Sequence, residues 1–185
     1  MKPSARIAAV PALALCLLAL GACGDKSGVE AENESVGSVA GKVAASEIKP
    51  KPGRWESVVK IEEMEIANVP PEVREAMKQQ AGVSQTVSTC LTPEQVESLD
   101  GSMFKDQAPG CKYERFSMTG GKIDAVMVCG EGPALEKTTL MGDYGEESYA
   151  IRMTSEGEAQ PGMRAKTVMS MTSRRVGECT GEEKP

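Results

Sequence analysis

The residue with the clearest chemical role is Cys23, which follows the small residues Gly21 and Ala22 at the end of an apolar run over residues 7–20. Its thiol is available for acylation, and small residues at the cut suit the narrow pocket of a signal peptidase. The position of Cys23 therefore indicates lipid attachment and cleavage just before this residue.

Two basic residues, Lys2 and Arg6, precede the apolar run, as in a secretory signal. The run is shorter than the roughly 20 apolar residues that a helix needs to cross a bilayer. The pattern resembles the bacterial lipobox, in which diacylglycerol is added to the cysteine before cleavage. We therefore predict that residues 1–22 are a lipoprotein signal peptide and that Cys23 is the lipidation site.

The predicted anchor makes the membrane a partner of the chain through the lipid on Cys23. It places the protein in the cell envelope, facing the periplasm. Gly24, rather than aspartate, follows the cysteine, and in enteric bacteria this permits transfer to the outer membrane. The outer membrane is therefore expected rather than the inner one.

Four further cysteines follow the signal, and an even number in an exported chain predicts two disulfides with three possible connectivities. We favour Cys90–Cys111 with Cys129–Cys179, because the first bond would staple a short helix and the second would tie down the C-terminus. Cys111–Cys129 with Cys90–Cys179 is the next alternative, since Cys111 and Cys129 lie almost opposite each other across a predicted hairpin. No CxxC spacing supports a metal site at these cysteines.

The composition argues against several classes of function. The chain has no histidine, so it lacks the commonest general base, the commonest zinc ligand and any Ser-His or Cys-His catalytic arrangement. Its net charge of −6 provides no electrostatic attraction to nucleic acid. We expect a non-enzymatic protein with no cofactor and no nucleic-acid partner.

Two alternatives retain some chemistry. Met169 and Met171 offer soft thioethers that suit cuprous copper, which would make the chain a periplasmic copper-handling protein. Glu114 and Asp124 lie on neighbouring predicted strands and would form the acid–base pair of a carboxylate-dependent hydrolase. The plainer interpretations are stronger, because methionine fills cores that are poor in aromatic residues and carboxylates solubilise the wet face of a sheet.

The mature chain divides by composition into three parts. Residues 23–52 are rich in Gly, Ser, Ala, Glu and Lys with isolated valines, which predicts a lipidated flexible tether. Residues 53–180 are predicted to form one disulfide-stapled antiparallel sheet domain. Residues 181–185 are expected to be a polar tail.

The domain shows mainly the alternation of apolar and polar residues that is typical of strands. In residues 55–66 the phase changes near Glu62 and Glu63, which predicts a β-bulge. Thr92 and Gln95 form a capping box that opens a short helix. The other predicted elements are a helix at 70–82 and strands at 83–91, 111–118, 122–129, 134–141, 147–154 and 165–176.

These elements predict an α+β fold, mainly an antiparallel curved sheet or half-barrel of about six to seven strands with two short helices. Glycine-containing turns separate the strands of two predicted hairpins, one at residues 119–121 and one at residues 142–146. A tight sandwich is the alternative architecture.

Several short pieces occur in an order that resembles a known family of exported proteobacterial envelope proteins, domain of unknown function 3617. They are Pro-Gly-Arg-Trp-Glu at 52–56, Cys-Leu-Thr-Pro-Glu at 90–94, Cys111-x-Tyr113-x-x-Phe116, Gly-Gly-Lys-Ile-Asp at 120–124 and Gly177-x-Cys179. The resemblance spans roughly residues 52–179. It implies an envelope protein with four cysteines, and it implies no activity and no catalytic residues.

We therefore expect a ligand- or partner-binding module. Its curved sheet would offer a concave face to an apolar ligand, or an edge to an envelope protein partner. The ligand version predicts a pocket lined by Val, Ile and Met side chains.

Overall fold

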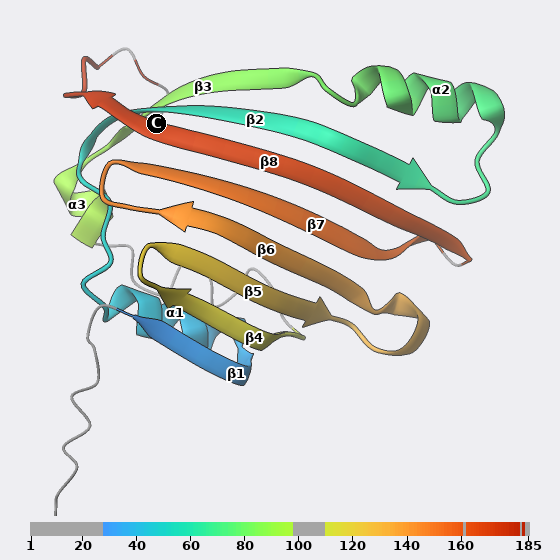
Figure 1. Cartoon of the computed structure of the whole chain (residues 1–185), viewed down its shortest axis with the longest axis horizontal. Coiled ribbons are helices and arrows are strands. Elements are labelled where there is room, and N and C mark those ends of the chain that lie inside the picture. The colour runs from blue at the N-terminus through green and yellow to red at the C-terminus, as the bar shows by residue number, and fades with distance from the viewer. Residues whose placement is uncertain (1–27, 98–109, 161, 182, 184–185) are drawn as a thin grey trace, which may run out of the picture.

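The computed structural model of the chain describes residues 28–97, 110–160, 162–181 and 183. These residues form one open antiparallel sheet of eight strands in the order β1-β4-β5-β6-β7-β8-β2-β3 (Figure 1). The strands are β1 (Val29–Ser35), β2 (Gly53–Ile66), β3 (Ser84–Leu91), β4 (Cys111–Thr119), β5 (Lys122–Cys129), β6 (Glu136–Tyr144), β7 (Ser148–Gln160) and β8 (Met163–Gly177). The helices are α1 (Val36–Ala44), α2 (Pro71–Gln80) and α3 (Pro93–Glu97), with a 3-10 turn, η1 (Gly132–Ala134).

The predicted α+β class with a mainly antiparallel sheet is confirmed, but the sheet is larger than the six to seven strands expected. The described residues build a single sheet and not the two packed sheets of a sandwich. No helix among them is long and apolar enough to span a membrane.

The additional strand and helix lie in the segment predicted to be a flexible tether, and that prediction is wrong for residues 29–44. β1 pairs with β4 at the sheet edge, so its alternating glutamates face solvent while Val29 and Ala31 are buried. Val36 and Val39 are three residues apart and Val43 follows four later, which places them on one side of α1. Tertiary contacts with the sheet order a segment whose composition alone suggests disorder.

Several local predictions are confirmed. The register of β2 against β8 shifts between Ile61 and Glu63, which is the expected bulge. The capping box is reciprocal. The backbone N–H of Gln95 donates to Thr92 Oγ1 at 3.2 Å, and the backbone N–H of Thr92 donates to Gln95 Oε1 at 2.9 Å. Gly120 and Gly121 both have positive φ angles, 56° and 75°, in the turn between β4 and β5.

The sheet has two ends that differ in what they carry (Figure 1). At the α3 end, β2 begins and β3 and β8 finish; at the α2 end, β2 finishes and β8 begins. β3 and β4 lie near opposite edges of the sheet. The chain between them therefore does not make a hairpin, and β4 begins at the α2 end.

This order explains the disulfides, which are Cys90–Cys179 and Cys111–Cys129. The favoured pairing of Cys90 with Cys111 is wrong, and the second alternative is confirmed. Cys111 and Cys129 are direct partners in the β4–β5 ladder at the α2 end. Cys90 and Cys179 lie at the α3 end, where β3 and β8 flank β2.

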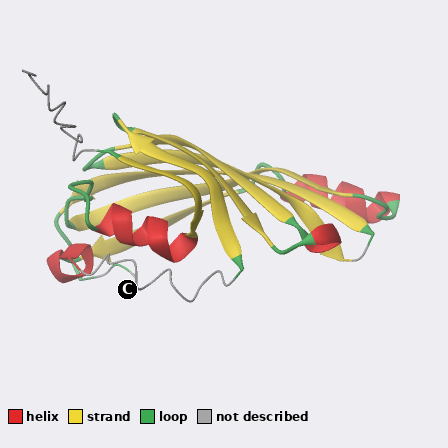
Figure 2. Ribbon diagram, turned by 90° about the horizontal axis from the view of Figure 1, so that it is seen from below, coloured by secondary structure: helices red, strands yellow, loops and turns green. Residues whose placement is uncertain are grey.

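The two faces of the sheet also differ. α1 lies against one face near the α3 end (Figure 2), where the main apolar cluster is buried. The other face carries cross-strand ion pairs, including Arg115–Asp124 at 2.7 Å and Arg152–Glu62 at 2.8 Å. The apolar cluster consists of Val29, Ala31, Val39, Phe116 and Ala125.

Candidate functional site: an apolar cleft beneath α1

A cleft of about 420 Å³ lies between α1 and the sheet. Its walls come from α1, from the segment that follows it at residues 48–50, and from β4 to β8. The lining residues are Val36, Val39, Ala40, Val43, Ala44, Ile48, Lys49, Pro50, Tyr113, Phe116, Met118, Ile123, Tyr144, Gly145, Tyr149, Ile151 and Met171. Eight of these 17 residues are Val, Ile or Met, the side chains expected to line a pocket for an apolar ligand.

The roof of the cleft is α1, and the residues around its start hold it in place. The Ser35 side chain caps the helix by accepting a hydrogen bond from the Ser38 amide at 3.2 Å. The Glu34 carboxylate accepts hydrogen bonds from Lys42 Nζ and, at 2.7 Å, from Ser38 Oγ. The Lys42 contact is the main cause that lowers the pKa of Glu34. Val39, which is only 2% exposed, then anchors α1 to the sheet.

The floor of the cleft follows from alternation along the strands. Met118, Ile123, Gly142, Ile151 and Met171 are successive cross-strand partners from β4 to β8, so they form one row on the α1 face. Gly142 interrupts this row because it has no side chain, and a Cβ there would overlap the backbone of Ala150. The row is therefore apolar.

All three tyrosines of the chain line the cleft. The Tyr144 hydroxyl is buried and has no hydrogen-bond partner among the described residues. An unsatisfied buried donor of this kind costs about 1–3 kcal/mol. The Tyr149 hydroxyl makes only a weak contact with Met171 Sδ at 3.9 Å, and burial raises the pKa of Tyr113. The cleft thus contains polar atoms that the protein leaves poorly satisfied.

The single tryptophan lies next to the cleft. Trp55 is 4% exposed, and its ring stacks on Tyr149 with centroids 6.1 Å apart. Its indole Nε1 donates to the Lys51 carbonyl at 3.0 Å. Trp55 is therefore a natural fluorescence reporter for events in the cleft.

Among the residues that line the cleft, Lys49 is the one charged side chain. Lys51, two residues on, lies between Glu146 and Glu147 at 3.3 Å from each. The hydrogen bond to Glu147 is the main cause that raises the pKa of Lys51. The charge of Lys51 is thus already balanced, whereas the structure gives Lys49 no ion pair within the described part of the chain.

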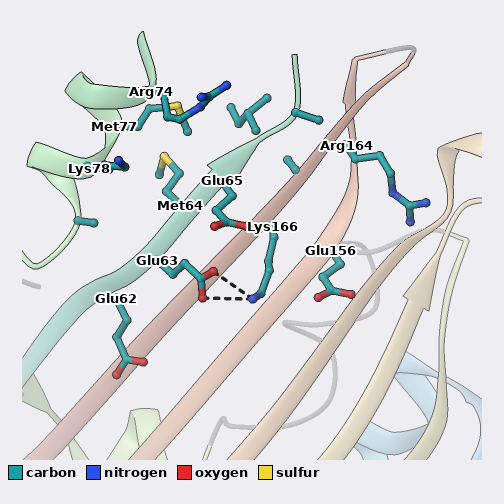
Figure 3. Close-up of a pocket in the computed structure, with 14 residues that line it drawn as sticks. Glu62, Glu63, Met64, Glu65, Arg74, Met77, Lys78, Glu156, Arg164 and Lys166 are labelled. Atoms are coloured by element: carbon teal, nitrogen blue, oxygen red, sulfur yellow. Dashed lines mark hydrogen bonds and ion pairs between the residues drawn. The ribbon is translucent and has the colours of Figure 1, made fainter. Parts of the chain in front are cut away.

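A second cavity of about 710 Å³ lies at the α2 end (Figure 3). Its lining contains four acidic and four basic side chains, and the Lys166 ammonium is 3.1 Å from the Glu63 carboxylate. Arg74 donates to the Val69 carbonyl at 3.3 Å. The acidic lining residues are Glu62, Glu63, Glu65 and Glu156, and the basic ones are Arg74, Lys78, Arg164 and Lys166.

The structure separates the residues of the two chemical alternatives. Glu114 pairs with Lys137 at 3.3 Å and Asp124 with Arg115 at 2.7 Å. Both carboxylates are about half exposed and line neither of the two cavities. Each carboxylate therefore pairs with its own cation and lies outside both cavities.

The predicted copper ligands are not gathered at the cleft, since Met171 lines it and Met169 does not. In the described ranges, no group of three or more His, Cys, Asp or Glu side chains is arranged to hold a metal ion. Cys23 and the predicted signal peptide lie outside the described residues. The four cysteines of the domain all form disulfides, so none of them offers a free thiol.

Neither the roof of the cleft nor the role of Tyr144 was predicted from the sequence. A signal for the roof was present, because Val36, Val39 and Val43 follow the helical period behind a capping Ser35. No local signal marks Tyr144, since cleft residues such as Val39 and Lys49 are far from it in the sequence.

Comparison with known protein families finds a match over most of the domain. A family model described as a protein of unknown function (DUF3617) matches residues 50–179. No curated protein and no solved structure matches the chain. The matched residues supply the floor of the cleft, while α1 lies before them.

Proposed function

We propose that this chain, which belongs to the DUF3617 family of proteins of unknown function, is a non-enzymatic module that binds an apolar ligand between α1 and the sheet. The observation that carries the proposal is the apolar lining of the 420 Å³ cleft. Small-molecule sites have volumes of about 300–1,000 Å³ and combine mostly apolar walls with a few polar groups. The concave face expected from the sequence would then be this binding face.

The proposal includes an envelope location, with the lipid on Cys23 as the anchor. The five residues from Gly24 to Gly28 can span at most about 18 Å when fully extended. Val29 starts β1 beside Met118, which lines the cleft. A lipid on Cys23 would therefore keep the cleft close to the bilayer, which is a source of apolar ligands.

The test uses residues 24–185, which include every described element, exported to the periplasm so that both disulfides form. The probe is the neutral dye N-phenyl-1-naphthylamine, which brightens in apolar sites and accepts energy transfer from Trp55. We expect saturable binding with quenching of Trp55. Mass spectrometry of the purified protein is expected to find a co-purified lipid.

A matched pair of variants localises the binding. Ala40→Phe places a ring inside the cleft and is expected to weaken dye binding at least tenfold. Met141→Phe, at a position that is 56% exposed on the other face, is expected to bind as the wild type does. Wild-type protein that binds neither dye nor lipid, or a folded Ala40→Phe variant with unchanged affinity, would contradict the proposal and leave a protein partner as the remaining role.

A further inference from the structure

We infer that the ligand is a single-chain amphiphile with a carboxylate head, of the fatty-acid class, whose head lies between Tyr144 and Lys49. The inference rests on the proposed function and specifies its ligand. It is argued from the two polar lining groups that the protein itself leaves without partners.

The first group is the Tyr144 hydroxyl. It is buried, lines the cleft and has no hydrogen-bond partner in the described structure. Buried hydroxyls are normally satisfied, because burial without a partner is unfavourable. A ligand oxygen that accepts a hydrogen bond from Tyr144 would remove this penalty.

The second group is Lys49. It is the one charged residue of the lining in a chain whose net charge is −6. Acidic residues outnumber basic ones in the chain, yet none of them lines the cleft. A cation at the border of an apolar cavity favours an anionic head over a neutral or cationic one.

The backbone brings these two groups to the same end of the cleft. The Lys51 amide donates to the Glu146 carbonyl at 2.7 Å, so the segment containing Lys49 lies along the β6–β7 turn. Tyr144 opens that turn as the cross-strand partner of Tyr149. One carboxylate has two acceptor oxygens and one negative charge, which suits one phenol donor and one ammonium.

The size of the cleft favours one hydrocarbon chain. Its 420 Å³ lies towards the lower limit of the usual range for ligand sites. The tail would follow the apolar row formed by Met171, Ile151 and Ile123 beneath α1. A two-chain phospholipid would need more space and would bring a larger head group than Tyr144 and Lys49 can serve.

The test compares three probes with the same twelve-carbon tail: laurate, 1-dodecanol and dodecyltrimethylammonium, each below its micellar concentration. Displacement of the naphthylamine dye reports their affinities. We expect laurate to bind at least tenfold more tightly than dodecanol and the cationic probe to bind most weakly. Equal affinities for the three probes would overturn the inference.

Variants assign the effect to the two residues. Tyr144→Phe and Lys49→Gln are each expected to weaken laurate binding about fivefold to tenfold. Lys49→Gln is expected to affect dodecanol much less than laurate, because dodecanol carries no charge, whereas Tyr144→Phe is expected to weaken both, because both offer an oxygen to the phenol. Lys60→Gln, an exposed charge change on β2, is the control and is expected to change none of these affinities. Tyr144→Phe is also expected to raise the Tm of ligand-free protein, because it removes the unsatisfied hydroxyl.

The outcomes separate the two proposals. Dye binding that persists while laurate affinity is unaffected by both variants would overturn the carboxylate inference and keep the proposed apolar function. Absence of dye binding to the wild type would overturn both.

Discussion

The smaller cavity lies at the α3 end of the sheet and the larger one at the α2 end. The two cavities differ in the polarity of the side chains that line them. The 420 Å³ cleft beneath α1 is apolar, with an unsatisfied hydroxyl and one free-standing cation. The 710 Å³ cavity beside α2 is lined by four glutamates and by four lysines and arginines, and Glu63 pairs with Lys166 there. By volume alone the second cavity would be the candidate ligand site. The first cavity is the better candidate because its polar groups lack protein partners.

The helices beside the two cavities, α1 and α2, also differ, in how much of their apolar surface is buried. α1 buries Val39 to 2% exposure, while Val73 of α2 remains 45% exposed. α2 has proline at its start and Gly82 with a positive φ of 90° after its end, so its local signals are the stronger ones. α1 is nevertheless the helix that packs on a sheet face, because its valines meet an apolar surface, whereas α2 lies along the sheet edge beside β2 (Figure 1).

The largest expected effect comes from the disulfides, one at each end. Replacing Cys90 and Cys179 with alanine is expected to cost about 4–5 kcal/mol of unfolding free energy, because the bond closes a separation of 89 residues. Replacing Cys111 and Cys129, separated by 18 residues, should cost about 3 kcal/mol. Urea unfolding measures both, and equal losses would show that chain entropy does not distinguish the ends.

The next effect tests the packing of the helices. Val39→Asp buries a carboxylate without a partner and should cost about 3 kcal/mol or more. Val73→Asp on α2 should change stability by less than about 0.5 kcal/mol. Chemical denaturation of the two variants checks the difference, and a similar loss in both would remove the contrast between α1 and α2.

A smaller effect tests the charged cavity. Glu63→Gln removes the partner of Lys166, and both side chains are 37% exposed. The expected loss is at most about 1 kcal/mol, since partly exposed ion pairs contribute little. Dye binding to the cleft should not change, and a loss of dye binding would link the two ends in a way that the structure does not predict.

The smallest effect concerns pH and the start of α1. The pKa of Glu34 is lowered from 4.5, chiefly by the hydrogen bond from Lys42. In the unfolded chain Glu34 binds a proton more readily, so its stabilising effect is full above pH 4.5 and is lost as the pH falls through the lowered folded-state pKa. The Tm of Glu34→Gln should therefore lie below that of the wild type at pH 7, and the difference should vanish in acid. A difference that persists at pH 2 would contradict the assignment.

Much of the local structure was predictable from the sequence. Alternation located β2 to β8, and the change of phase near Glu62 located the bulge in β2. Thr92 and Gln95 marked the start of α3. These features depend on residues that are close together in the chain, so their patterns are visible without the fold.

The sequence predicted the apolar character of the candidate site, but not all of the elements that form it. The sequence indicated an apolar pocket lined by Val, Ile and Met, but it did not indicate α1 as the roof or Tyr144 as a buried polar group. α1 has only nine residues and contains two glycines, so it would not be stable by itself. It gains order because β1 pairs with β4 and Val39 packs in the apolar cluster on the sheet face.

The sequence by itself determined strands β2 to β8, the hairpin turns, the family and the four cysteines of the domain. Only the tertiary structure decided that Cys90 bonds Cys179, that β3 and β4 lie near opposite edges, and that α1 covers the row from Met118 to Met171. The reason is that strand order and helix docking depend on contacts between distant residues. The free energy of those contacts is not encoded in any local period of the chain.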